Sequence, residues 1–107
     1  MSGLKILLAL DVSGSINIES ALKQVQSVLD KINPEAEVTF STFDYFGLNY
    51  ISRENFMGGN FPGGAGTTLK YVLDVCDQYD YTYVITDGYI DDLDKLPHYS
   101  EVILLED

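Results

Sequence analysis

Apolar residues in this chain occur either in short unbroken runs or at intervals of three and four positions. The run 4–10 is almost wholly apolar and ends at Asp11, which is typical of a strand buried on both faces of a parallel sheet. Runs at 38–43 and 81–86 are rich in β-branched and aromatic residues, and 102–105 is a shorter apolar run. These runs predict further strands.

Two segments between the strands have helical spacing. The first begins after Asn17, a favourable N-cap residue, and ends before Pro34. Its apolar positions are Ile18, Ala21, Leu22, Val25, Val28, Leu29 and Ile32. The second begins at Thr67 or Thr68. Its apolar face consists of Leu69, Val72, Leu73 and Cys76. Residues 56–66 are rich in glycine and are expected to form a loop.

The order of these elements predicts the fold class. Residues 45–52 can pair antiparallel with the preceding strand, so the order is β-α-β-β-α-β-β. Apolar strands alternating with amphipathic helices favour a three-layer α/β/α sandwich around a mostly parallel, doubly wound sheet. We expect the strand order 3-2-1-4-5, with the third strand as an antiparallel edge. The 107 residues contain no repeat or linker, and we expect a single domain, 1–107.

Composition and charge narrow the classes of function. Hydrophobic residues make up 46% and charged residues 21%, which is typical of a globular chain. Seventeen acidic and six basic residues give a net charge of −11, which argues against binding to nucleic acid or to an anionic membrane. There is no apolar run of spanning length, no targeting signal and only one cysteine, so we expect a cytoplasmic protein.

The residues that follow the strands carry the candidate chemistry, because ligands of open parallel sheets bind at the carboxyl ends of the strands. Asp11-Val12-Ser13-Gly14-Ser15 follows the first strand in the pattern D-x-S-x-S. Thr86-Asp87-Gly88 follows the fourth strand, and Gly66-Thr67-Thr68 precedes the second helix. Three segments thus bring carboxylate and hydroxyl oxygens to one edge.

Such a set of oxygen donors suits Mg²⁺, and also Mn²⁺ or Ca²⁺, better than zinc. Alternate residues of an extended turn point the same way, so Asp11, Ser13 and Ser15 can face one point. Asp87 and Thr67 would then bind the ion directly or through water. We prefer Thr67 to Thr68 because it directly follows the glycine.

These three segments resemble the metal-site loops of von Willebrand factor A-like domains, in the same order and on matching elements. The resemblance covers essentially the whole chain and is strongest to the short bacterial and phage branch. It implies a metal-ion-dependent adhesion site, with Asp11, Ser13, Ser15, Thr67 and Asp87 at the five matching positions. It also implies a protein partner that completes the metal shell with a Glu or Asp. Relatives are often encoded beside AAA-type ATPases and serve as adaptors, so by analogy an AAA-type ATPase system is a candidate partner. The chain is shorter than familiar members and lacks the H-E-x-x-H segment of metallopeptidase relatives.

Three hypotheses about function follow. In the first, the protein is not an enzyme but a metal-dependent binding module that captures a carboxylate on a partner. In the second, it is a Mg²⁺-dependent phosphohydrolase with Asp11 as nucleophile and Asp87 with Asp91 or Asp92 holding the metal. Ser13 stands where such enzymes usually carry a second Asp, and no phosphate-binding Lys is evident. In the third, the domain is an interaction module with a vestigial site.

Other polar residues have simpler interpretations. Asp91, Asp92 and Asp94 lack the spacing of an EF-hand and are expected to form a solvated acidic loop. Asp44 ends the second strand, and a role in the following turn is favoured over a role near the metal.

His98 is expected on the surface and Cys76 in the core. Most aromatic residues are expected to pack in the core or the hairpin. Phe56, Phe61 and Tyr89 are candidates for an aromatic rim that contacts a partner.

Overall fold

A computed structural model describes residues 3–14, 16–88 and 90–105. Its strands are β1 (Lys5–Asp11), β2 (Glu37–Asp44), β3 (Gly47–Ile51), β4 (Tyr81–Thr86) and β5 (Ser100–Leu104). Its α-helices are α1 (Ile18–Lys31), α2 (Arg53–Met57) and α3 (Lys70–Val75). Two 3₁₀ turns, η1 (Cys76–Gln78) and η2 (Leu93–Lys95), complete the regular structure.

The five strands form one mostly parallel sheet in the order β3-β2-β1-β4-β5, as predicted. The central strand β1 is parallel to β2 on one side and to β4 on the other. Strand β3 is antiparallel and pairs only with residues 40–44 of β2. The strands that directly follow β1 in sequence, β2 and β3, therefore lie on one side of it, and the later strands β4 and β5 lie on the other side. The point between β1 and β4 where the order reverses is where open α/β sheets bind ligands.

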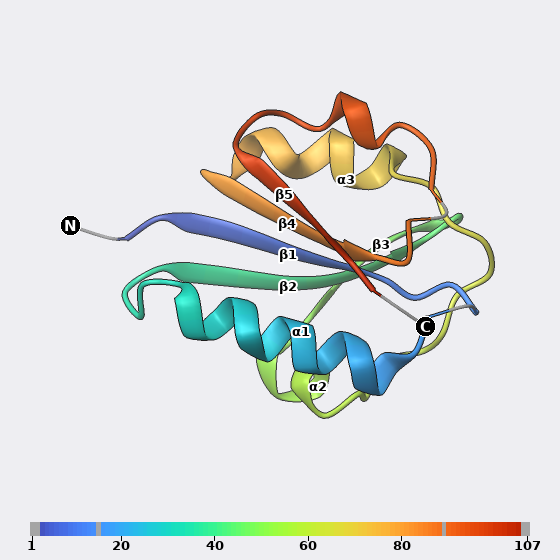
Figure 1. Cartoon of the computed structure of the whole chain (residues 1–107), viewed down its shortest axis with the longest axis horizontal. Helices are drawn as coiled ribbons and strands as arrows, with labels where there is room; N and C mark the ends of the chain where they lie inside the picture. The colour runs from blue at the N-terminus through green and yellow to red at the C-terminus, as the bar shows by residue number, and fades with distance from the viewer. Residues whose placement is uncertain (1–2, 15, 89, 106–107) are drawn as a thin grey trace.

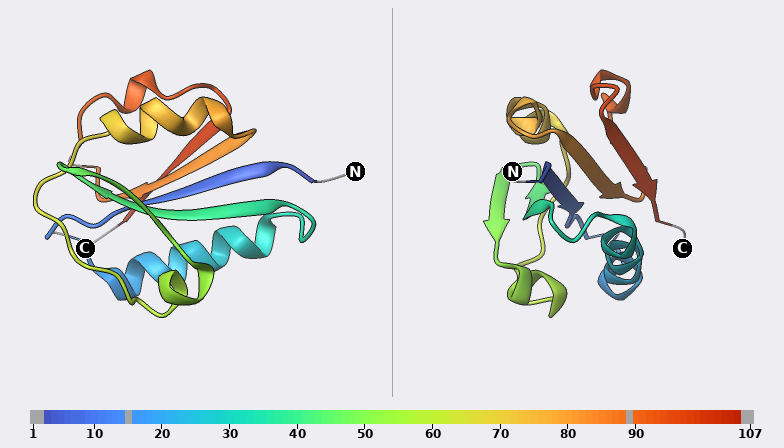
Figure 2. Two further views of the ribbon diagram at one scale, coloured as in Figure 1. Left: turned by 180° about the vertical axis from the view of Figure 1, so that it is seen from behind. Right: turned by 90° about the vertical axis from the view of Figure 1, so that its left-hand side faces the viewer.

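The helical segments lie on both faces of the sheet, with α1 and α2 on one side and α3 and η2 on the other (Figures 1 and 2). Because side chains alternate along a strand, β1 contributes to both sides. Leu8 and Leu10 pack in one buried cluster with Val25 of α1. Ala9 packs in a second cluster with Val72 of α3. The central strand is thus buried on both faces, as its apolar run predicts.

Helix α1 begins and ends where the sequence predicts. The side chain of Asn17 caps it by accepting a hydrogen bond from the backbone N–H of Ser20, at 3.1 Å. The helix ends at Lys31, before Pro34. It is 14 residues long, and none of the helices in the described part of the chain is long and apolar enough to cross a lipid bilayer.

The prediction of loop throughout residues 56–66 was wrong at its start, because Phe56 and Met57 belong to the short helix α2. Ser52 caps this helix by accepting a hydrogen bond from the backbone N–H of Asn55, at 3.2 Å. Phe56 is fully buried, and its ring centroid lies 5.0 Å from that of Phe40. A cap and one buried aromatic side chain stabilise a helix too short to show a periodic pattern.

We expect Phe56→Ala to lower the free energy of unfolding by about 3–5 kcal/mol, because it leaves a cavity beside Phe40. Urea denaturation followed by circular dichroism measures this change. Phe46→Ala is the matched control, since Phe46 is 73% exposed and its truncation should change stability by less than about 0.5 kcal/mol. Equal losses in the two variants would contradict the packing described for α2.

Candidate functional site

Asp11 is the centre of the candidate site. It is the last residue of β1 and has no exposed surface. Its Oδ1 accepts a hydrogen bond from the backbone N–H of Ser13 at 2.9 Å, and its Oδ2 accepts one from the Thr86 hydroxyl at 2.8 Å. The carboxylate therefore joins the turn after β1 to the end of β4, at the point where the strand order reverses.

Alternation along the strands explains why Asp11 and Thr86 meet. Ala9 and Val84 both pack in the buried cluster on the α3 side of the sheet. Asp11 and Thr86 each lie two residues further along the same strands, so their side chains share that face. The register agrees, because Leu10 lies opposite Ile85. The same periodicity that buries the core therefore directs these polar groups toward the start of α3.

The D-x-S-x-S segment forms a tight turn after β1. Besides the bond from Ser13 to Asp11, the backbone N–H of Ile16 donates to the carbonyl oxygen of Ser13 at 3.1 Å. This turn holds the backbone of Ser13 next to the Asp11 carboxylate, and the role of the Ser13 hydroxyl as a ligand stays a prediction. Ser15 lies outside the described residues, so its predicted role as a ligand stays a prediction.

The glycine-rich segment (residues 58–69) crosses the carboxyl end of the sheet from the side of α2 to the side of α3 (Figures 1 and 2). The backbone N–H of Gly64 donates to the carbonyl oxygen of Val12 at 2.7 Å. A Cβ atom at Gly64 would lie only 2.5 Å from the Cβ of Asp44. Only glycine therefore lets this segment approach the ends of β1 and β2 so closely.

Thr67 and Thr68 have different surroundings. The Thr67 hydroxyl oxygen is buried and has no hydrogen-bond partner among the described residues. The Thr68 hydroxyl accepts a hydrogen bond from the backbone N–H of Lys70, at 3.4 Å. A buried hydroxyl without a partner costs free energy unless water or an ion satisfies it. The choice of Thr67 as the candidate ligand stays a prediction, whereas the Thr68 hydroxyl already contacts the backbone of Lys70, the first residue of α3.

The turn after β4 contains Asp87 and depends on Gly88. Gly88 has a φ of +91°, a left-handed conformation that favours glycine. Its backbone N–H donates to the Thr86 hydroxyl oxygen at 3.3 Å. Asp87 lies between these two residues and is half-buried. Asp87 is therefore adjacent in sequence to Thr86, whose hydroxyl donates to Asp11.

Sequence reasoning missed the role of Thr86. Its hydroxyl accepts from Gly88 and donates to Asp11, so it connects two of the three predicted segments. Threonine is common in strands for its β-branched shape, so its type alone indicates nothing about this role. Its place between an apolar strand and Asp87 is the signal that could have suggested it.

The donors at this edge fit a small, hard cation. Among the described residues, no Lys, Arg or His forms an ion pair with the buried Asp11 carboxylate. A buried charge requires compensation, and a divalent cation held by hydroxyl and carboxylate oxygens would supply it. No group of three His, Cys, Asp or Glu residues suited to a metal occurs within the described ranges. Apart from the carboxylates, the oxygen donors that this candidate site offers are hydroxyl groups.

No known protein family and no curated protein matches this chain. The chemistry assigned to this edge therefore rests on the geometry of the chain itself. The three segments that carry it are far apart in sequence. They are joined by the two hydrogen bonds of the Asp11 carboxylate, by the bond from Gly64 to Val12, and by the packing of Leu69 in the cluster that contains Ala9.

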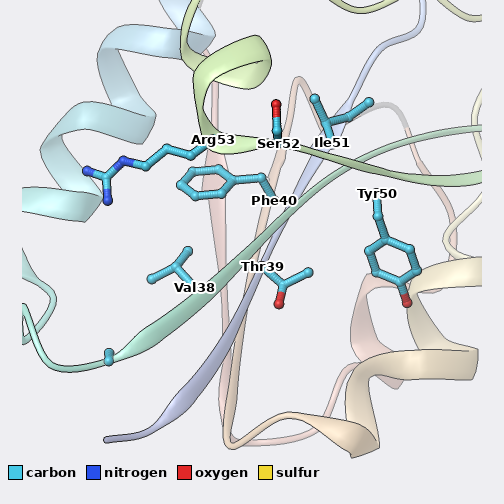
Figure 3. Close-up of a pocket in the computed structure, with 8 residues that line it drawn as sticks. Val38, Thr39, Phe40, Tyr50, Ile51, Ser52 and Arg53 are labelled. Carbon is cyan, nitrogen blue, oxygen red and sulfur yellow. The ribbon is translucent and has the colours of Figure 1, made fainter.

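A pocket among the described residues lies elsewhere, between β2, β3 and the start of α2 (Figure 3). It has a volume of about 470 Å³. Arg53 lies over the ring of Phe40 at its rim, with 5.9 Å from the guanidinium carbon to the ring centroid. Val38 and Thr39, in the first half of β2, also line it, so it lies away from the carboxyl end where Asp44 stands.

The other acidic residues behave as expected. Asp44 Oδ1 accepts hydrogen bonds from the backbone N–H groups of Phe46 and Gly47, at 2.9 and 3.1 Å, so it shapes the turn between β2 and β3. Asp91, Asp92 and Asp94 are exposed. Asp92 forms an ion pair with Lys95 at 3.4 Å.

His98 is exposed and Cys76 is buried, as predicted. Burial, with a smaller contribution from neighbouring Asp77, raises the pKa of the Cys76 thiol, which disfavours a reactive thiolate.

The proposal of Phe56 as part of an aromatic rim was wrong, because its side chain is fully buried. Phe61 is half-buried and packs against Phe56, with ring centroids 5.7 Å apart. Tyr89 lies outside the described residues.

We expect Thr86→Val to lower the free energy of unfolding by about 1–3 kcal/mol, because it leaves a buried oxygen of Asp11 without its donor. Thr82→Val is the matched control in the same strand, since the Thr82 hydroxyl is buried and forms no hydrogen bond within the part of the chain that the structure describes. That change should be neutral or stabilising. Urea denaturation measures both, and a larger loss in Thr82→Val would contradict the role given to Thr86.

Proposed function

We propose that this protein is a divalent-metal-dependent binding module of the von Willebrand factor A-like class. Its fold would be a shortened three-layer α/β/α sandwich with a doubly wound sheet. Its metal-ion-dependent adhesion site would capture a carboxylate on a protein partner. The observation that carries the proposal is the buried hydroxyl of Thr67, which has no hydrogen-bond partner among the described residues, near an edge where the Asp11 carboxylate is buried without an ion pair to any of those residues.

The residues of the chain would hold Mg²⁺, or Mn²⁺ or Ca²⁺, in different ways. Ser13, Ser15 and Thr67 would offer hydroxyl oxygens. Asp11 already accepts two hydrogen bonds, so it would mainly orient Ser13 and supply negative charge. Asp87 would contribute the second carboxylate, directly or through water. A cation bound mostly by neutral hydroxyls keeps its affinity for one further anionic oxygen.

The partner would be a protein that supplies a Glu or Asp side chain. The net charge of −11 repels an acidic surface, so this partner should be neutral or basic outside the recognised carboxylate. We propose a cytoplasmic location, and by analogy an association with an AAA-type ATPase system. Nucleic acid and membranes are not proposed as partners.

Metal binding gives a direct test. Excess Mg²⁺ at about 100 times its Kd should raise the melting temperature of the unaltered protein by roughly 10 °C. Thr67→Val should abolish this rise, because it removes the hydroxyl that would bind the ion. Thr68→Val is the matched control and should keep it, since that hydroxyl contacts the backbone of Lys70. Differential scanning calorimetry with Mg²⁺ and with a chelator measures the shift.

Asp11→Asn and Ser13→Ala should also lose the Mg²⁺ response while the circular dichroism spectrum of the fold persists. A full Mg²⁺ response in Asp11→Asn would contradict the proposal. The absence of any response to Mg²⁺, Mn²⁺ or Ca²⁺ in the unaltered protein would favour an interaction module with a vestigial site.

The geometry opposes the phosphohydrolase alternative. Asp11 has no exposed surface and both of its oxygens accept hydrogen bonds. A nucleophilic carboxylate must instead reach the phosphorus atom of a bound substrate. We therefore propose binding without catalysis.

We expect no turnover of an aryl phosphate by the protein with Mg²⁺ above the rate with buffer alone. Release of the phenolate, followed by absorbance, measures this. Turnover that disappears in Asp11→Asn would make the protein an enzyme and would overturn the proposal. Turnover that persists in Asp11→Asn would indicate a contaminating phosphatase.

A further inference from the structure

An exposed pair of aromatic side chains lies at the turn between β2 and β3. Tyr45 is 61% exposed and Phe46 is 73% exposed. Their rings meet edge to face, with centroids 5.5 Å apart. Phe46 is the most exposed large apolar side chain in the part of the chain that the structure describes. Exposed aromatic groups are enriched where proteins bind one another, so this pair is a candidate contact surface.

The turn presents the pair in a fixed position. Asp44 Oδ1 accepts hydrogen bonds from the backbone N–H groups of both Phe46 and Gly47. These bonds define the backbone on either side of the Phe46 side chain. A contact group that is already ordered loses little conformational entropy when a partner binds.

Tyr45, one member of this pair, lies against the segment that carries Thr67. A Cβ atom at Gly66 would lie 3.3 Å from the Cβ of Tyr45, and Gly66 directly precedes Thr67. Gly64, in the same segment, approaches Asp44 and hydrogen-bonds to Val12. The aromatic pair and the candidate metal ligands therefore share one edge of the sheet. Tyr45 is therefore next to the segment that a partner of the candidate metal site would contact.

The net charge of the chain indicates which contact groups such a partner must have. The chain carries a net charge of −11, which opposes the approach of a carboxylate, and salt screens this repulsion only beyond about 8–10 Å. One carboxylate–metal contact would thus benefit from a neighbouring contact without charge. An aliphatic side chain beside the carboxylate could supply it by packing on the two rings.

We propose that Tyr45 and Phe46 select a partner segment in which the recognised Glu or Asp is flanked by an aliphatic side chain. This inference rests on the proposed function and specifies the chemistry of the partner. In it, the site recognises two neighbouring features, an anionic oxygen and an apolar group. The contact that distinguishes one acidic segment from another comes from the aromatic pair.

The test uses three capped peptides of equal length and the full chain with Mg²⁺. One peptide has Glu flanked by Leu, the second has Glu flanked by Ser, and the third has Gln flanked by Leu. We expect the first to bind roughly tenfold more tightly than the second, and the third not to bind. Chemical-shift titration by NMR measures these affinities.

Phe46→Ser should remove the preference for Leu while it leaves the Kd for Mg²⁺ and for the Ser-flanked peptide unchanged. Leu4→Ser is the control, because Leu4 is 56% exposed but precedes β1 at the opposite end of the sheet. That variant should keep the full preference.

Equal binding of the Leu-flanked and Ser-flanked peptides by the Mg²⁺-loaded protein would overturn this inference and leave the proposed function intact. Failure of Mg²⁺ to bind would overturn both. Equally tight binding of the Leu-flanked peptide in chelator would show that the aromatic pair acts apart from the metal, and would also overturn the inference. So would a dimer that Phe46→Ser dissociates in sedimentation velocity, since the pair would then serve self-association.

Discussion

The hydrogen bond between Thr86 and the buried Asp11 carboxylate is the interaction on which the site depends. A carboxylate with no exposed surface is tolerated only where donors surround it. Here one donor comes from the turn after β1 and the other from the end of β4. The bond therefore fixes the geometry of two segments that are 75 residues apart in the chain. It does so at the position where the sheet topology leaves room for a ligand.

The glycine-rich segment adds the third part of the site under a strict steric limit. Gly64 lies so close to Asp44 that no larger residue fits without a shift of the backbone. This approach places the start of α3 against the ends of β1 and β2. It also brings the Thr67 hydroxyl into a buried position where none of the described residues forms a hydrogen bond with it. Tight packing of backbone and an unsatisfied polar atom thus occur together, as is common where a protein has a binding role.

Much of the fold follows from the sequence because its determinants are local. The apolar run that ends at Asp11 predicts a central strand, and the Asn17 cap predicts the start of α1. The antiparallel edge strand also follows, since short hairpins leave few alternatives. Helix α2 does not follow, because Phe56 is held by a tertiary contact with Phe40 that no local pattern reveals.

The site is predictable only in part for the same reason. The strand-end rule places Asp11, Thr67 and Asp87 at one edge, but it does not tell which hydroxyl becomes buried. The difference between Thr67 and Thr68 depends on the path of the glycine-rich segment across the sheet. The bond from Thr86 to Asp11 depends on register between β1 and β4, which requires the assembled sheet.

The crossing of the glycine-rich segment has a mechanical consequence. Its two ends continue into helices on opposite faces, so the segment is anchored on both sides of the sheet. Packed interiors are hardly compressible, and they pass on small displacements instead of absorbing them. A displacement of the chain beside Val12 would therefore be transmitted to both α2 and α3. The segment thus connects the two halves of the core by a second route, in addition to the sheet that they share.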